Sequence, residues 1–194
     1  THRFDIAQAP DAYELITGKL KQPFLGVLLT YPQASNAPAA TRVRVAQAAA
    51  AAPLKGDPGL GILGAGNYAT AVFLPNVQKV GGVQKVAIAT ASGVSARHAA
   101  QRYGFQIASS SEDELFEDPD IQILALLTRH QHHARQVLAG LAHGKHVFCE
   151  KPLAVTPVEL DEIESVINSL DEKSPRVMVG FNRRFAPYSR ELKR

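Results

Sequence analysis

Short apolar runs alternate along the chain with segments in which apolar residues recur at helical spacing. From residue 59 onward the runs predict six strands, at residues 60–63, 83–90, 106–108, 121–128, 146–149 and 176–179. Between them the spacing predicts helices, at residues 67–74, 94–103, from 111, at 134–141 and at 156–170. This alternation is typical of a parallel sheet with helices on both faces. Six strands match the two halves of a doubly wound fold, so the expected fold class is α/β.

Local signals refine the helix ends. The helix that begins near Asn67 is expected to end before Pro75, since a residue that precedes proline disfavours helical geometry. The stretches 111–114 and 156–159 both carry the Ser/Thr-x-x-Glu capping box, and Pro157 suits the first helical position of the second.

The first 58 residues have a different pattern. A short helix around residues 12–16, with Gly18 as its C-cap, is followed by an apolar run at 24–31 that suits a buried strand. Alanine makes up ten of the twenty residues 34–53, so residues 33–58 are interpreted as a linker. Within the linker, residues 48–52 favour a helix, and the alternation of valine and arginine at 42–45 indicates a short edge strand.

Composition and charge exclude several classes of protein. Of the 194 residues, 45% are hydrophobic and 20% charged, which excludes a wholly disordered chain. The net charge of +3 is concentrated in residues 181–194, which carry +4 and leave −1 elsewhere, so a nucleic-acid partner is not expected. A single cysteine excludes an intrachain disulfide and a multi-cysteine metal site. No apolar run approaches the roughly 20 residues of a membrane span, so we expect no membrane partner and a cytoplasmic location.

The glycine motif at residues 64–69 carries the first chemical signal. Gly64-Ala-Gly66-Asn67-Tyr68-Ala69 has the Gly-x-Gly-x-x-Ala form, between the first strand of the α/β region and the next helix. Gly64 allows the tight turn, and Gly66 lets the backbone approach a pyrophosphate. The helix that follows points its free N–H groups at the phosphates. The alternative is a glycine turn that only joins strand to helix.

The end of the next strand bears on cofactor choice. A site that prefers NAD usually carries an acid about 20 residues past the glycines, but residues 89–93 contain none. Thr90 and Ser92 could bond a ribose 2′-phosphate, and Arg97 could pair with it. We therefore expect NAD or NADP, with NADP favoured; the alternative is a polar loop with a solvated arginine.

Polar residues also follow the strands at 121–128 and 146–149, at the same sheet edge. Thr128, His130 and His133 fit a loop beside the nicotinamide half of the cofactor. A metal site is disfavoured because no acid or cysteine completes the histidine set, and a plain helix N-terminus is a further alternative. After Glu150, Lys151 could hold substrate hydroxyls or assist proton transfer, unless it is an ordinary surface lysine. The neighbouring cysteine, at 149, is interpreted as buried and inert.

Three of these stretches together resemble the glucose–fructose oxidoreductase/inositol dehydrogenase (Gfo/Idh/MocA) family: residues 62–69, residues 128–133 and Gly144–Leu153. The resemblance covers residues 59–194, and Glu150-Lys151-Pro152 is its most specific part. It implies a Rossmann domain at 59–180 that binds NAD(P), including contacts from Glu150 and Lys151. It also implies a C-terminal α/β domain for substrate, and a role for Lys151 where cofactor and substrate meet.

The two ends of the chain carry further resemblances. Residues 179–188 resemble the crossing point between the two domains of that family, so residues 181–194 are expected to begin the substrate domain. Residues 1–32 resemble the end of a medium-chain, zinc-alcohol-dehydrogenase-like domain, which implies a bi-domain oxidoreductase. The start at Thr1 and the stop at Arg194 indicate a chain cut at both ends.

The leading hypothesis is a fragment of an NAD(P)-dependent oxidoreductase that transfers hydride between the nicotinamide and a small sugar-like or polyol alcohol or carbonyl. Lys151 would be its catalytic residue. The competing hypothesis is a non-catalytic NAD(P)-binding module or sensor. A methyltransferase is disfavoured, since it gives Glu150-Lys151-Pro152 no role. Substrate, activity of this chain alone and assembly into homo-oligomers are left open.

Overall fold

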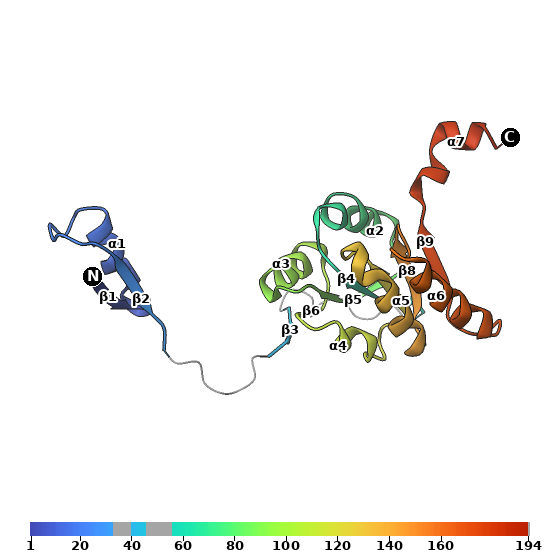
Figure 1. Cartoon of the computed structure of the whole chain (residues 1–194), viewed down its shortest axis with the longest axis horizontal. Coiled ribbons are helices and arrows are strands. Elements are labelled where there is room, and N and C mark those ends of the chain that lie inside the picture. Colours follow the sequence, from blue (N-terminus) through green and yellow to red (C-terminus); the bar gives the residue numbers. More distant parts are fainter. Residues whose placement is uncertain (33–39, 46–55, 194) are drawn as a thin grey trace. The chain divides into compact units, whose positions relative to one another are not determined.

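The chain forms two compact units that divide between residues 39 and 40 (Figure 1). The structure is a computed structural model, and it describes residues 1–32, 40–45 and 56–193. The helix expected at residues 48–52 lies outside the described residues.

The smaller unit contains a two-stranded parallel sheet and one helix. Its elements are β1 (His2–Asp5), η1 (Ile6–Gln8), α1 (Ala9–Ile16) and β2 (Val27–Thr30). The predicted helix is confirmed, and it buries Ala12 and Leu15. The prediction of a buried strand is wrong, because β2 alternates between half-buried and exposed residues and Leu28 is 49% exposed. Alternation of this kind marks a sheet with one face packed and one face open.

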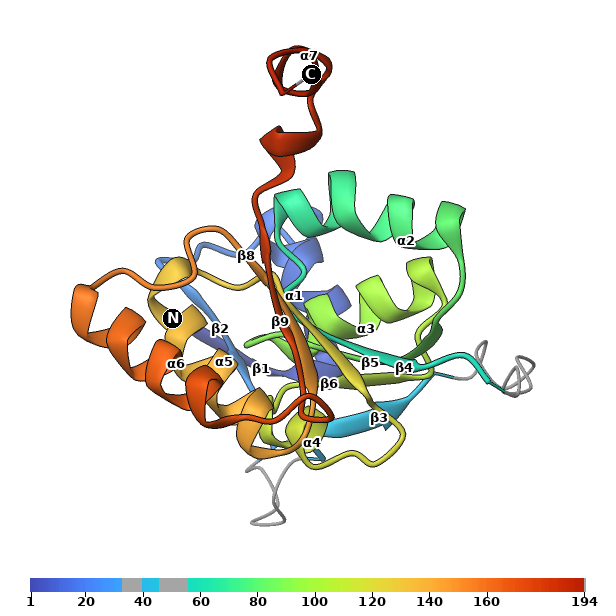
Figure 2. The ribbon, with the colours of Figure 1, turned by 90° about the vertical axis from the view of Figure 1, so that its right-hand side faces the viewer.

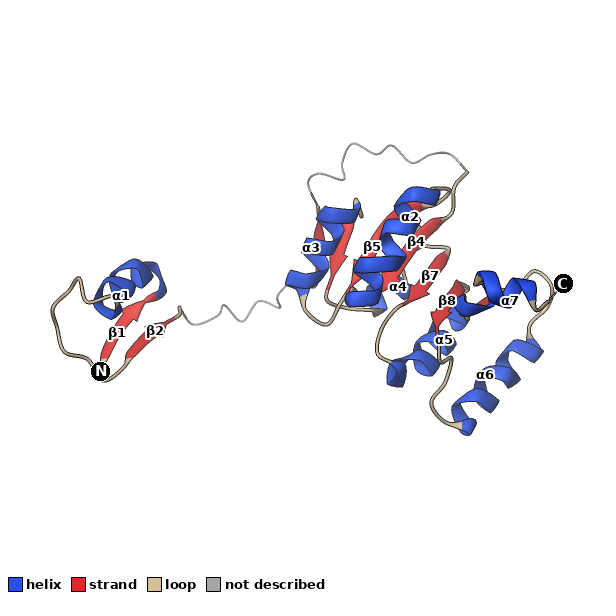
Figure 3. Ribbon diagram, turned by 90° about the horizontal axis from the view of Figure 1, so that it is seen from above, coloured by secondary structure: helices blue, strands red, loops and turns tan. Residues whose placement is uncertain are grey.

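The larger unit is built on one sheet of seven strands within the described residues. In chain order these are β3 (Arg42–Arg44), β4 (Gly59–Leu63), β5 (Gln84–Ala89), β6 (Ile107–Ser109), β7 (Ile123–Leu126), β8 (His146–Glu150) and β9 (Val177–Gly180). Their spatial order is β3-β6-β5-β4-β7-β8-β9, and every pairing is parallel except that of β3 with β6. Figure 3 shows the central strands β5, β4, β7 and β8 side by side. The six predicted parallel strands are confirmed. Successive strands are added on one side of β4 as far as β6 and on the other side from β7 onward. The switch point therefore lies between β4 and β7, where doubly wound folds bind ligands.

Helices cover both faces of this sheet, as the alternation predicted. The helical segments are η3 (Ala69–Phe73), α2 (Leu74–Val80), α3 (Gly93–Tyr103), α4 (Asp113–Phe116), η4 (His130–His132), α5 (His133–Ala142), α6 (Pro157–Ser169), η5 (Asn182–Phe185) and α7 (Pro187–Glu191). Figure 2 shows α2 and α3 on one face and α5 and α6 on the other. Two apolar cores result, one containing Leu74 and Tyr103, the other Val137 and Ile163.

The helix after the glycine motif does not end before Pro75, contrary to the prediction. It runs through η3, a π-helical segment, into α2 and ends at Val80. Proline lacks the N–H that an α-helix needs and crowds the preceding turn. The wider π turn bonds Leu74 N to Ala69 O, five residues back, and so accommodates the proline where the two segments join.

The two predicted capping boxes have different outcomes. Thr156 and Glu159 form one at the start of α6, with Pro157 at the first helical position, as predicted. The box predicted at 111–114 is wrong, because α4 begins after Glu112 without a side-chain cap. Glu114 instead accepts hydrogen bonds from the hydroxyls of Ser109 and Thr41.

The edge strand predicted within the linker is confirmed as β3, which pairs antiparallel with β6. Arg42 of this strand forms a 2.6 Å ion pair with the buried Asp118, and Val45 enters the apolar core. Residues 40–45 therefore belong to the larger unit.

Candidate functional site: a cavity at the sheet switch point

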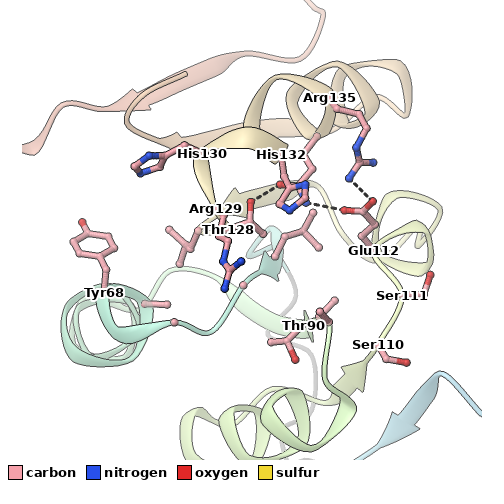
Figure 4. A pocket seen from close by; sticks show the side chains of 18 of the residues that line it. Tyr68, Thr90, Ser110, Ser111, Glu112, Thr128, Arg129, His130, His132 and Arg135 are labelled. Carbon is pink, nitrogen blue, oxygen red and sulfur yellow. Dashed lines mark hydrogen bonds and ion pairs between the residues drawn. The ribbon is translucent and has the colours of Figure 1, made fainter. Parts of the chain in front are cut away.

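A cavity of about 1010 Å³ opens at the carboxyl edge of the sheet, where the loops after β4, β5, β6 and β7 meet (Figure 4). Seven residues predicted from the sequence line it: Gly64, Gly66, Asn67, Tyr68, Thr90, Thr128 and His130. Five others predicted for the site do not line it: Ser92, Arg97, His133, Glu150 and Lys151. The cavity also has polar lining residues that the sequence analysis did not single out: Ser110, Ser111, Glu112, Arg129, His132, Arg135 and Gln136.

The glycine motif shapes the floor of the cavity. Gly64 has φ +97°, and a Cβ at this position would lie 2.6 Å from the carbonyl oxygen of Leu127, so both conformation and space require glycine. A Cβ on Gly66, by contrast, would meet no protein atom within 4 Å. Protein packing therefore does not explain the second glycine, whereas the approach of a ligand to its backbone does.

The helix after the motif offers unbonded donors to the cavity. Its first backbone hydrogen bond runs from Thr70 N to Gly66 O at 3.0 Å. The N–H groups of the preceding turn have no partner inside the helix and, with the helix dipole, favour an anion. Ala69 is 1% exposed and so permits the close helix–strand packing expected of the motif.

The loop after β5 bounds the cavity at Thr90 and Ala91. The Thr90 hydroxyl donates to the carbonyl oxygen of Ser92, which closes the turn into α3. Ser92 and Arg97 are exposed on the adjoining first turns of α3, and the Ser92 side chain makes no capping hydrogen bond. The loop presents no carboxylate to the cavity.

A chain of hydrogen bonds closes one wall. The Thr128 hydroxyl donates to Gln136 Oε1 at 2.6 Å, and Gln136 Nε2 donates to Glu112 at 2.7 Å. Arg135 completes the wall through a 2.6 Å ion pair with the same carboxylate. Because the Thr128 hydroxyl already donates its proton to Gln136, its oxygen lone pairs remain free, and we expect it to accept a hydrogen bond from a ligand.

His133 supports the cavity from behind. Its side chain is 0% exposed, and its ring nitrogens lie 2.6 Å from the Pro152 carbonyl oxygen and 3.1 Å from that of Thr128. The ring therefore ties the loop after β7 to the loop after β8. His133 acts on the cavity through Thr128.

Tyr68 links the cavity to the Glu150-Lys151 segment. Burial raises the pKa of the Tyr68 phenol, and the Glu150 carboxylate beside it raises the pKa further, while Asn182 opposes the shift. Glu150 is 8% exposed, and it accepts a hydrogen bond from the Lys151 backbone N–H at 3.2 Å. The Lys151 side chain itself is exposed.

The structure also bears on three other features considered from the sequence: the cysteine, a metal site and a membrane span. Burial raises the pKa of the Cys149 thiol to about 12, and its side chain is 0% exposed, as expected of an inert cysteine. Residues 1–32, 40–45 and 56–193 contain no group of three or more His, Cys, Asp or Glu residues arranged to hold a metal ion. In the same ranges, no helix combines the length and apolar character needed to cross a membrane.

Comparison with curated proteins gives relatives over the larger unit. The chain is 37% identical over 105 residues to levoglucosan dehydrogenase of Pseudarthrobacter phenanthrenivorans, covering 54% of this chain and 26% of the relative. It is 28% identical over 134 residues to myo-inositol 2-dehydrogenase of Thermotoga maritima, covering 69% of this chain and 39% of the relative. The chain thus spans well under half the length of these two relatives.

Solved structures show the same architecture. The 3-ketoreductase KijD10 of Actinomadura kijaniata, in complex with NADP and TDP-benzene, superposes with a TM-score of 0.64 at 23% identity. That match covers 70% of this chain and 41% of KijD10, and at this identity it shows the fold alone. A putative myo-inositol dehydrogenase from Sinorhizobium meliloti 1021 has a TM-score of 0.58 at 29% identity, over 67% of this chain and 38% of that one.

A family model decides the relationship. Residues 59–181, which contain the glycine motif and nearly all of the parallel sheet, match the model described as the oxidoreductase family with an NAD-binding Rossmann fold. The match covers more than half of the chain, and it includes all loops that line the cavity. The chain therefore belongs to the Gfo/Idh/MocA family of NAD(P)-binding oxidoreductases.

Proposed function

We propose that the cavity binds a nicotinamide dinucleotide, and that the intact protein transfers hydride between it and a sugar-like or polyol alcohol or carbonyl. The observation that carries the proposal is Gly66, where the only space a side chain would fill is space open to a ligand. It lies at the switch point of the sheet, next to free N–H groups that favour phosphate. When bound, the nicotinamide supplies the hydride chemistry.

We assign the residues of the chain to parts of the nucleotide. Gly64, Gly66, Asn67 and Tyr68 would hold the pyrophosphate, and Thr128 and His130 would border the nicotinamide ribose. His133 would position Thr128. Glu150, beside the Tyr68 phenol, would contact the cofactor together with Lys151. Lys151 would also bind the substrate hydroxyl and assist its proton transfer.

The substrate class rests on the relatives. Levoglucosan dehydrogenase and myo-inositol 2-dehydrogenase are named for sugar-like or polyol compounds. Because the chain spans 26–39% of these proteins, the substrate of the intact protein is a proposal drawn from their names.

NADP is the proposed preference. The loop after β5 presents no carboxylate to repel a 2′-phosphate, and the Ser92 hydroxyl and the Arg97 side chain are exposed beside it. Binding of NADH tenfold tighter than NADPH would contradict this preference.

We further propose the domain organisation expected from the sequence. Residues 1–32 would end a medium-chain dehydrogenase-like domain, and residues 181–194 would begin a substrate domain after a Rossmann domain at residues 59–180. The linker expected at residues 33–58 would be interrupted by residues 40–45, which belong to the larger unit. The division of the chain into units at residues 1–39 and 40–194 supports an N-terminal unit separate from the Rossmann domain. Coding sequence on either side tests the organisation: a zinc dehydrogenase upstream and an α/β domain downstream are expected. A cytoplasmic location remains part of the proposal, supported by the single, reduced cysteine.

Thermal unfolding of the purified chain tests the cofactor. We expect NADPH and NADH, each at 1 mM, to raise the melting temperature, because a ligand that binds only the folded state stabilises it. S-adenosylmethionine at the same concentration is the matched control for the methyltransferase alternative and should not shift the transition. A shift with S-adenosylmethionine alone would overturn the proposal.

A further inference from the structure

Charge in the cavity is unbalanced by one arginine. Among the described residues that line it, Glu112 is the only acid, while Arg129 and Arg135 are both arginines. Arg135 is neutralised by its 2.6 Å ion pair with Glu112. Arg129 makes no side-chain hydrogen bond or ion pair with any described residue. The cavity therefore carries one uncompensated guanidinium, and a cationic site of this kind favours an anionic ligand.

The backbone of Arg129 is held in place although its side chain is free. Arg129 is the N-cap residue of η4, with extended backbone angles, and its carbonyl oxygen accepts a hydrogen bond from His132 N at 2.9 Å. The preceding residue, Thr128, is fixed by Gln136 and by the buried His133 ring. In Figure 4 the Arg129 side chain points into the cavity. The base of the side chain is thus fixed at the cavity wall.

We propose that Arg129 pairs with the pyrophosphate of the bound dinucleotide, opposite the N–H groups of the glycine turn. The proposal deepens the proposed function and rests on it. Two charged phosphates would then be held from both sides, by the backbone of residues 64–68 and by the planar donors of Arg129. Arginine forms such charge-assisted, bidentate contacts with phosphate more readily than lysine.

Sheet order favours the pyrophosphate over a 2′-phosphate. Arg129 follows β7, the immediate neighbour of β4, and the glycine turn follows β4. The two loops touch, because Leu127 O would lie 2.6 Å from a Cβ on Gly64. The 2′-phosphate would lie beyond the end of β5, on the far side of β4. Strands are about 4.8 Å apart, so β5 lies roughly 10 Å from β7, whereas β4 is the adjacent strand.

The test measures dissociation constants for NADH, NADPH and ADP-ribose with the whole chain and with Arg129→Gln. All three nucleotides contain the pyrophosphate, and only NADPH contains the 2′-phosphate. We expect Arg129→Gln to weaken all three by a similar factor of roughly tenfold or more, the usual effect of losing a charge-assisted hydrogen bond. Arg129→Lys, which keeps the charge and loses the bidentate geometry, should recover part of the loss. Higher salt should reduce the difference in dissociation constant between the unchanged chain and Arg129→Gln, because salt screens the attraction between the guanidinium and the phosphates.

Arg44→Gln is the matched control. It removes one positive charge from an exposed position on β3, outside the cavity lining, and should leave the three constants within twofold. Circular dichroism verifies that each variant is folded. Unchanged binding in Arg129→Gln would overturn the inference, and weakening confined to NADPH would assign Arg129 to the 2′-phosphate and overturn it as well. If the unchanged chain bound no nucleotide, the proposed function itself would fail. If the unchanged chain bound all three nucleotides and Arg129→Gln bound them equally well, only the inference about Arg129 would fail.

Discussion

Replacing His133 by alanine tests how the loops behind the cavity are held. The ring is fully buried and joins the carbonyl oxygens of Thr128 and Pro152. No other donor among the described residues bonds either oxygen. An imidazole that carries a single N–H donates to one of these two oxygens, so His133→Ala would remove the donor of at least one buried acceptor, at a cost of about 1–3 kcal/mol.

The expected loss of stability stays within this range. Thr128 and Pro152 are half-buried, so water can reach part of the orphaned oxygens once the ring is gone. We expect the free energy of unfolding to fall by about 1–3 kcal/mol, a sizeable share of the roughly 5–15 kcal/mol typical of a folded domain. His133→Gln, which keeps a donor, should lose about half as much.

Urea unfolding followed by far-ultraviolet circular dichroism measures this loss. His98→Ala is the matched control, because His98 is exposed on α3 and should change the free energy of unfolding by less than about 0.5 kcal/mol. If His133→Ala unfolded at the same urea concentration as His98→Ala, the buried bridge between the two loops would be refuted.

Further predictions concern the glycines and the cysteine. Gly66→Val should fold normally, since a Cβ there meets no protein atom, yet a calorimetric titration should show NADPH binding weakened at least tenfold. Gly64→Val should also lower the melting temperature, because its backbone conformation and its surroundings both require glycine. Equal melting temperatures for the two variants would contradict the different roles of the two glycines. Burial raises the pKa of Cys149 to about 12, so the unfolded thiol ionises first as pH rises and stability is lost above pH 9, by about 1.4 kcal/mol at pH 10. Cys149→Ala should remove that part of the pH dependence of unfolding, and an unchanged slope between pH 9 and pH 10 would contradict it.

The sequence predicted the sheet because its central strands are buried on both faces. Parallel strands such as β4 and β7 are continuous apolar runs, and glycines such as Gly104 and Gly144 mark the helix ends with positive φ. Pro75 misled because the signal is local: proline disfavours a regular α-helix, but a π turn accommodates it. The capping box predicted at Glu114 is wrong because two hydroxyls bond its carboxylate instead. They belong to Ser109, at the end of β6, and to Thr41, just before β3, and no local pattern reveals either.

The part of the site formed by loops at the carboxyl edge of the sheet was predictable, because the strand order places those loops together. Residues that follow β4, β5 and β7 were placed at one edge by the alternation rule, and Gly64, Thr90 and Thr128 meet at one cavity. The same rule, applied to β6, would have found Ser110–Glu112. Arg135 and Gln136 lie on a helix, and only the three-dimensional packing shows that they turn toward Glu112. Whether a histidine faces a ligand or is buried behind it, as His133 is, also depends on that packing.

A crystal structure of the chain with NADPH tests the central claim most directly. We expect the pyrophosphate within hydrogen-bonding distance of the backbone N–H groups of residues 66–68, in the space above Gly66, with the nicotinamide half toward Thr128 and His130. A nucleotide bound elsewhere on the chain, or a glycine turn left empty at saturating NADPH, would contradict the account.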